Sequence, residues 1–67
     1  MQRQVVVSSR MVSVGWENDV LEVQFHDGAI YQYFNVSKDE YIAFLNSPSL
    51  GKELSRLDKI HPYQRVR

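Results

Sequence analysis

An alternation of apolar with small or polar residues, repeated on either side of a turn, most limits how this chain can fold. Apolar side chains recur at every second position in two runs, first Val12, Val14 and Trp16 and then Leu21, Val23 and Phe25. A period of two is typical of strands with one buried face. Asn18 and Asp19 separate the runs, and both residue types tolerate the left-handed conformation of a tight turn. With these two at the tip of a hairpin, the six apolar residues share one face, Val12 lies opposite Phe25, and Met11 faces the other way.

A second turn is predicted at His26-Asp27-Gly28, and two registers fit it. A two-residue loop would pair Phe25 with Ile30. A three-residue loop with Gly28 in the left-handed conformation, as in a G1 bulge, pairs Phe25 with Ala29 instead. We favour the second register because it sets the aliphatic residues of the middle strand against the two tyrosines of the third. The result is a three-stranded antiparallel meander.

Two short helices are predicted after the meander. Ser37 and Glu40 have the spacing of a capping box, so the first helix begins after Ser37. Pro48 disfavours helix at the residue before it and ends that helix. Ser49 can cap a second helix over residues 50–60. The side chains expected to face the core are Tyr41, Ile42, Phe44 and Leu45 in the first helix and Leu50, Leu54 and Leu57 in the second.

The chain has 67 residues, enough for one small domain with a modest core. We expect a single α+β domain over residues 1–67, with residues 1–10 as an N-terminal arm or short edge strand and residues 62–67 as a tail. The sequence has no cysteine, and its longest apolar run near the N-terminus, Val5-Val6-Val7, is far too short to span a membrane. A cytoplasmic location without membrane contact is expected.

The residues that most often carry chemistry are isolated from one another. His26 and His61 have no companion at metal-ligand spacing, so we interpret them as turn or surface residues and expect no metal. The serines include no nucleophile elbow, and the glycines form no phosphate-binding loop. The acidic residues lie at turns and helix starts, where local structure accounts for them. We therefore expect no catalysis, no cofactor and no small-molecule substrate.

Tyr31-Gln32-Tyr33 sets two aromatic rings on one face of the third strand. Tyrosines on a sheet can stack nucleic-acid bases, but alternate tyrosines on an inner strand are also ordinary core residues. The register favours the core interpretation. On the opposite face, Ile30 and Phe34 are either covered by the valines of residues 4–7, which we favour, or exposed as an interaction patch.

Basic residues are concentrated in the C-terminal third of a chain whose net charge is zero. Lys52, Arg56 and Lys59 have the helical spacing that sets them on one face of the second helix. Beyond that helix follow Tyr63, an aromatic residue on which a base could stack, and two more cations, Arg65 and Arg67. Zero net charge argues against a dedicated nucleic-acid binder, although a phosphate experiences the local patch. The set is either a solvated helix face with a tail or an electrostatic footprint for a phosphate backbone.

The chain resembles the KTSC domain, a short domain found at the C-terminus of some lysyl-tRNA synthetases and as a free-standing protein in bacteria and phages. The resemblance covers nearly the whole chain and is carried by an ordered set of residues: Val7-Ser8-Ser9, Val14-Gly15-Trp16, Leu21, Val23, Phe25, Gly28, Tyr31-Gln32-Tyr33, Val36, Tyr41, Leu45, Ser49, Gly51, Tyr63 and Arg65. The match is poorer between Lys52 and Lys59. The synthetase context of the family implies RNA as a partner.

Two functions are compatible with these features. The first is a non-catalytic RNA-binding module that uses Lys52, Arg56, Lys59, Tyr63, Arg65 and Arg67. The alternative is a protein-interaction module, an accessory protein of a bacterium or phage, that uses the face of Ile30 and Phe34 or the acidic loops. The basic C-terminal third favours RNA, whereas the zero net charge favours a protein partner.

Overall fold

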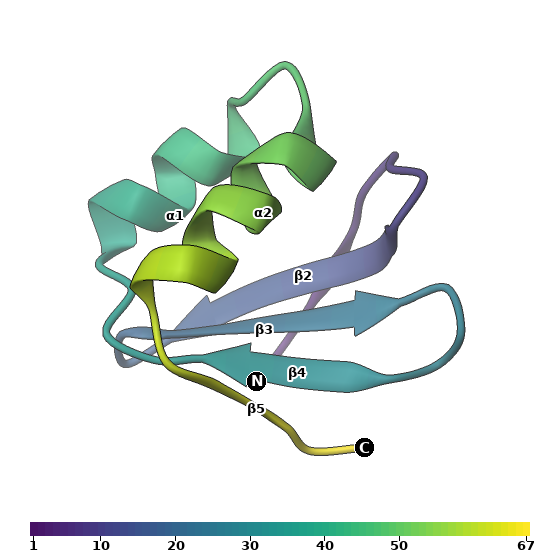
Figure 1. Cartoon of the computed structure of the whole chain (residues 1–67), viewed down its shortest axis with the longest axis horizontal. Coiled ribbons are helices and arrows are strands. Elements are labelled where there is room, and N and C mark those ends of the chain that lie inside the picture. Colours follow the sequence, from purple (N-terminus) through teal and green to yellow (C-terminus); the bar gives the residue numbers. More distant parts are fainter.

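The computed structural model describes residues 1–67 and contains one antiparallel sheet with both helices on one of its faces (Figure 1). The strands lie in the order β1-β2-β3-β4-β5, with bounds Gln4–Val5, Met11–Glu17, Val20–Phe25, Ile30–Tyr33 and Tyr63–Arg65. Helices α1, Lys38–Leu45, and α2, Leu50–Ile60, lie between β4 and β5 in the chain. The α+β class and the β2-β3-β4 meander are as predicted, but the sheet has five strands, so the predicted count of three is wrong.

The two additional strands lie at opposite edges of the sheet. β1 pairs with β2, so the N-terminal residues form an edge strand. β5 pairs with β4, so residues 62–67 are not the free tail that was expected. Both strands have only two or three residues, too few for an alternation to be visible in the sequence. They are held by pairing with strands that are distant in the chain.

The hairpin between β2 and β3 follows the prediction at its tip and departs from it at its far end. Asn18 and Asp19 form the turn with φ of 50° and 64°. The predicted pairing of Val12 with Phe25 is wrong, because a bulge after Met11 shifts the register and sets Met11 opposite Phe25. A bulge adds one residue to one strand, which turns the side chains beyond it to the other face. Met11 is accordingly fully buried.

The hairpin between β3 and β4 has the predicted three-residue loop. Gly28 has φ 91°, and the N–H of Phe25 donates to the carbonyl oxygen of Ala29 at 2.9 Å. Tyr31 pairs with Val23 of β3, and Tyr33 pairs with Leu21. These side chains therefore lie together on the face of the sheet that the helices cover. Tyr33 is only 2% exposed, whereas Tyr31 is half-buried.

Both helices begin at the predicted caps. The side chain of Ser37 accepts from the N–H of Glu40, whose carboxylate accepts in return, and Ser49 caps α2. In the predicted inward stripe of α1, Phe44 is fully buried and Tyr41 and Leu45 pack against the core, but Ile42 is 45% exposed, so the stripe is narrower than predicted. A helix of two turns presents only a narrow stripe to the sheet beneath it.

The core lies between the helices and the sheet. Residues 1–3, which we call the N-terminal arm, cross the opposite face of the sheet. The core consists of Met11, Val14, Leu21, Val23, Tyr33, Val36, Phe44, Leu54 and Leu57. On the opposite face, Arg3 donates to the hydroxyl of Ser13 at 3.1 Å and pairs with Glu22 at 2.5 Å. Gly15 makes room for this arm, because a Cβ there would lie 2.4 Å from the carbonyl oxygen of Gln2.

Candidate functional site

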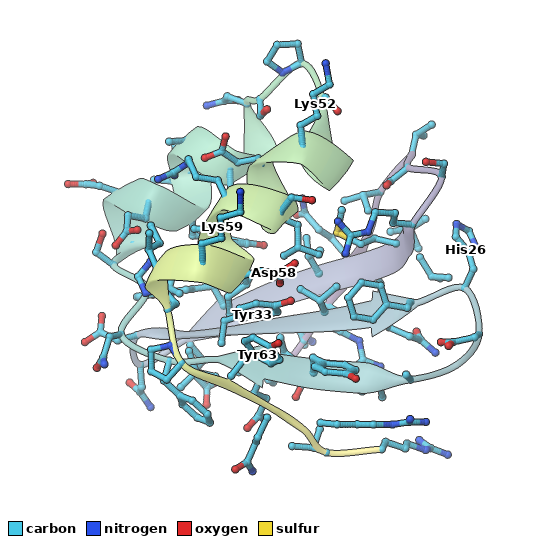
Figure 2. The ribbon with its side chains drawn as sticks, viewed as in Figure 1. His26, Tyr33, Lys52, Asp58, Lys59 and Tyr63 are labelled. Carbon is cyan, nitrogen blue, oxygen red and sulfur yellow. The ribbon has the colours of Figure 1, made fainter.

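An open pocket of about 300 Å³ lies between the C-terminal half of α2 and strands β3, β4 and β5. We call it the β5 pocket. Figure 2 shows Tyr33 and Asp58 pointing toward one another between the sheet and α2, with Tyr63 of β5 beside Tyr33. The lining of the β5 pocket combines four aromatic rings with two basic and two acidic side chains. It therefore offers both flat apolar surface and charge.

The aromatic rings of the β5 pocket form a continuous cluster. Phe25 and Tyr31 meet edge to face with their centroids 5.4 Å apart. The ring of Tyr63 lies 5.9 Å from that of Tyr31 and 5.2 Å from that of Tyr33. The strand register explains this, because Tyr63 pairs with Tyr33 and Arg65 with Tyr31, which sets all four on one face. Tyr63 remains 50% exposed and can accept a planar ligand.

A polar network closes the pocket on the side of α2. The hydroxyl of Tyr33 donates to Asp58 at 2.5 Å, and the other carboxylate oxygen of Asp58 lies 3.8 Å from Arg10. Arg10 also donates to the carbonyl oxygen of Gly51 at 3.1 Å and to the hydroxyl of Ser55 at 2.9 Å. Burial, and then the hydrogen bond to Asp58, raise the pKa of Tyr33 far above its ordinary value. This hydroxyl is therefore a protonated donor and not a nucleophile.

The remaining charges of the pocket differ in how far they are engaged. Asp27 accepts from the N–H of Ala29 at 3.0 Å, which is a contact of the β3–β4 turn. Arg65 donates through Nε to the carbonyl oxygen of Arg67 at 3.0 Å. Its terminal nitrogens have no protein acceptor, so Arg65 is a cation at the rim with donors to spare.

Four of the six predicted site residues lie in the last turn of α2 or beyond it in the chain. Tyr63 and Arg65 line the β5 pocket. Lys59 lies in the last turn of α2 and is exposed, but it does not line the pocket, and its side chain points away from the sheet (Figure 2). Arg67 follows β5, and its N–H donates to the carbonyl oxygen of Ile30 at 3.3 Å. The residues expected to act as a tail are thus held against the sheet.

The other two predicted cations lie further away or are engaged. Lys52 is in the first turn of α2, at the opposite end of the helix from Lys59 (Figure 2). Arg56 donates to Glu53 through Nε at 2.8 Å, and this pair raises the pKa of Arg56. The basic face of α2 is therefore uneven, and Lys59 is its member at the end of the helix that leads into β5.

Seven of the nine residues that line the pocket were not predicted as site residues: Arg10, Phe25, Asp27, Ala29, Tyr31, Tyr33 and Asp58. Tyr31 carried a signal, since the Tyr-x-Tyr pattern is compatible with base stacking as well as with the core. No pattern in the sequence pointed to Arg10, because its partner Ser55 is 45 residues away in the chain.

The apolar patch considered for Ile30 and Phe34 is not formed. Ile30 is 6% exposed, and its backbone forms hydrogen bonds with the backbone of Val66 and Arg67. The expected cover from residues 4–7 is wrong, because β1 lies at the far edge of the sheet and Val7 is 99% exposed. Phe34 is half-buried.

His61 and Glu40 form hydrogen bonds outside the β5 pocket. His61 places one ring nitrogen 3.1 Å from the carbonyl oxygen of Phe34 and the other 2.8 Å from Glu40. The hydrogen bond with His61 lowers the pKa of Glu40. No three His, Cys, Asp or Glu side chains gather as a group able to hold a metal ion. None of the helices has the length and apolar character needed to cross a bilayer.

Known proteins resemble this chain along almost its whole length. The family model of the KTSC domain matches residues 7–59. An uncharacterised protein of Stutzerimonas stutzeri is 35% identical over 66 residues, which cover 96% of this chain and 93% of that protein. The crystal structure of a KTSC domain protein from Yersinia pestis is similar with a TM-score of 0.89 and 32% identity, covering 98% of this chain and 97% of that one.

Proposed function

The chain belongs to the KTSC domain family, and from the geometry of its β5 pocket we propose that it is a non-catalytic module that binds single-stranded RNA. In this proposal an unpaired base stacks on Tyr63, and the phosphates of the same strand contact Arg65, Arg67 and Lys59. The proposal includes the cytoplasmic location expected from the sequence.

The half-exposed ring of Tyr63 is the observation that carries this proposal. It is supported from beneath by Tyr31 and Tyr33, at centroid distances of 5.9 and 5.2 Å, so it is held in one place on the sheet. A fixed aromatic ring of this kind is a platform for an unpaired base, since every base has a π-face. Bases inside a duplex are not accessible to such a ring, which is why we propose a single strand.

The charges around Tyr63 suit a strand that passes over the rim of the pocket. Arg65 has unpaired donors on the same strand, and Lys59 is exposed at the end of α2. Both can contact phosphates on either side of a stacked base. Arg56 contributes less, because Glu53 already neutralises it.

The two acids of the pocket do not oppose this arrangement. Asp58 faces inward and is engaged by Tyr33 and Arg10, and Asp27 is engaged by the turn of which it is part. A base has polar edges and no net charge, so it can enter a pocket that is neutral overall. The phosphates would remain at the rim, where the cations are unpaired.

Titration of a fluorescently labelled single-stranded RNA at several salt concentrations tests the proposal. Contact of Lys59, Arg65 and Arg67 with three phosphates predicts a log–log salt slope of about −2. Changing Lys59→Ala together with Arg65→Ala removes two of those contacts, and the slope should become shallower by about 1.4. Both side chains are exposed, so the fold should be retained.

Lys38→Ala is the matched control, because Lys38 is an exposed lysine of α1 outside the pocket. It should bind as wild type does. If wild type binds no RNA at low salt, RNA is not the partner, and the alternative of a protein partner at the acidic loops takes its place. If the double variant keeps the wild-type slope, the RNA contact lies outside the β5 pocket.

A further inference from the structure

β1 presents an unpaired apolar edge to solvent. The pairing with β2 continues past Val5, because the N–H of Val6 donates to the carbonyl oxygen of Val12 at 3.1 Å. In an antiparallel pair, successive residues direct their backbone groups alternately toward and away from the partner strand. Those of Val5 and Val7 therefore point outward. Val5 is 82% and Val7 99% exposed, the highest values among the large apolar residues.

This edge lacks the features that usually prevent strands from pairing. Exposed edges are normally protected by charged side chains or proline. At the other edge, β5 follows Pro62 and carries Arg65. The charged residues nearest in the chain to Val5, Val6 and Val7 are Arg3 and Arg10, and both are engaged with other parts of the molecule. Arg3 is bound to Glu22 on the back of the sheet, and Arg10 reaches across to α2.

We propose that residues 4–8, which comprise β1 and the three residues after it, pair antiparallel with residues 4–8 of a second copy of this chain, about a twofold axis through Val6. In this register Val5 lies opposite Val7 of the second copy, and Val7 opposite Val5. All four of these residues have outward backbone groups, so each pair exchanges two N–H···O=C bonds. The two most exposed aliphatic side chains of each copy cover those of the other.

A second copy suits this edge because the segment is complementary to itself. The twofold axis sets Gln4 opposite Ser8, and neither is charged, so no like charges are brought together. Strands of this length bury little surface, which makes a weak dimer that depends on concentration. β5 lies at the opposite edge of the sheet, so both β5 pockets of the pair stay open. If the proposed RNA contact holds, one strand could engage both pockets.

Sedimentation equilibrium up to a concentration on the order of 1 mM tests this pairing. The apparent mass of wild type should rise from 7.9 kDa toward twice that value. Val7→Lys places a charge against the second copy and should remain monomeric at every concentration, with the fold intact because the side chain is in solvent. Ile42→Lys removes a comparable exposed aliphatic residue from α1 and should associate as wild type does.

Amide NMR spectra of wild type locate the contact. As concentration rises, the amide signals of Val5 and Val7 should shift and gain protection from exchange, while those of Tyr63 and Arg65 at the other edge stay constant. A wild type that is monomeric throughout overturns the proposal and leaves the β1 edge to a strand of another protein. Association of Val7→Lys at the wild-type strength, or shifts confined to β5, would also overturn it.

Discussion

Tyr33 joins the sheet to α2 through a polar contact at the border of the core. Its ring is one of the largest fully buried side chains, and its hydroxyl donates to Asp58 at 2.5 Å. Arg10, 3.8 Å from the other oxygen of Asp58, completes the network. One side chain thus supplies apolar burial to the core and a donor to a carboxylate on the helix.

Tyr33→Phe keeps the ring and removes the donor from Asp58. Hydrogen bonds to charged groups contribute about 1.5–3 kcal/mol, and because Asp58 is partly accessible to water we expect a loss near the lower limit. Urea denaturation measures this free energy of unfolding. Tyr63→Phe is the control, since no hydrogen bond of that hydroxyl is present, and its stability should equal that of wild type. Equal stability of the two variants would show that the Tyr33 hydroxyl contributes nothing.

Gly15 is required by the N-terminal arm and not by its own backbone conformation. A Cβ there would lie 2.4 Å from the carbonyl oxygen of Gln2 and 3.1 Å from the Arg3 side chain. We expect Gly15→Ala to cost about 1–3 kcal/mol, as for other substitutions that overfill a packed site. The same change in a chain without residues 1–3 should cost far less, because the obstructing atoms are gone. Equal losses in the two backgrounds would disprove this account.

The N-terminal arm and the sheet are linked through Glu22. One carboxylate oxygen accepts from Arg3 at 2.5 Å and the other from Gln32 at 2.9 Å. Burial alone would raise the pKa of Glu22, but the hydrogen bonds from Gln32 and Arg3 and the charge of Arg3 outweigh it, so the pKa lies below its ordinary value. The ionised carboxylate is therefore the form that the fold stabilises.

This lowered pKa predicts acid sensitivity. The stabilisation by Glu22 is present above the ordinary pKa of 4.5 and is lost as the pH falls through the lower pKa of the folded state. Glu22→Gln should be less stable than wild type near neutral pH, and its free energy of unfolding should fall less between about pH 6 and pH 3. The pKa of Glu40 is also lowered, so the free energy of unfolding of the variant still depends on pH to some extent. Parallel pH profiles of the two proteins would contradict this interpretation.

The elements that could be predicted are those specified by local residues. Asn18-Asp19 and Gly28 set the two hairpin loops, and Ser37 and Ser49 set the two helix starts. The bulge after Met11 has no local signal, and it sets in the core a residue that was predicted on the other face of the strand. β5 was not predicted, and for residues 1–10 an arm and a short edge strand were both left open, because two or three residues become a strand only when a neighbouring strand supplies the partner groups.

The candidate site could be predicted only in part for the same reason. Tyr63 and Arg65 follow from the cluster of aromatic and basic residues near the C-terminus, and both line the β5 pocket. Arg10 and Asp58 reach the pocket from distant segments, so no spacing in the sequence connects them. Lys52, predicted on helical spacing alone, lies at the other end of α2 from the pocket (Figure 2).

On the scale of the whole molecule, the two helices cover only part of the sheet, and this leaves the β5 pocket open (Figure 1). β5 returns from α2 to the edge of β4 and carries Tyr63 into that opening. The two open edges of the sheet then differ in character. The β5 edge combines an aromatic platform with unpaired cations, and the β1 edge is apolar and uncharged.

Aromatic NMR signals report whether a single strand of RNA stacks a base on Tyr63. Wild type is titrated with a short unstructured RNA while the tyrosine ring signals and backbone amides are followed. We expect the ring signals of Tyr63 and Tyr31 to shift progressively and to saturate, while the amides of Asn18 and Asp19 at the distant β2–β3 turn stay unchanged. RNA binding that leaves both tyrosine rings unaffected, or no binding at low salt, would contradict the account.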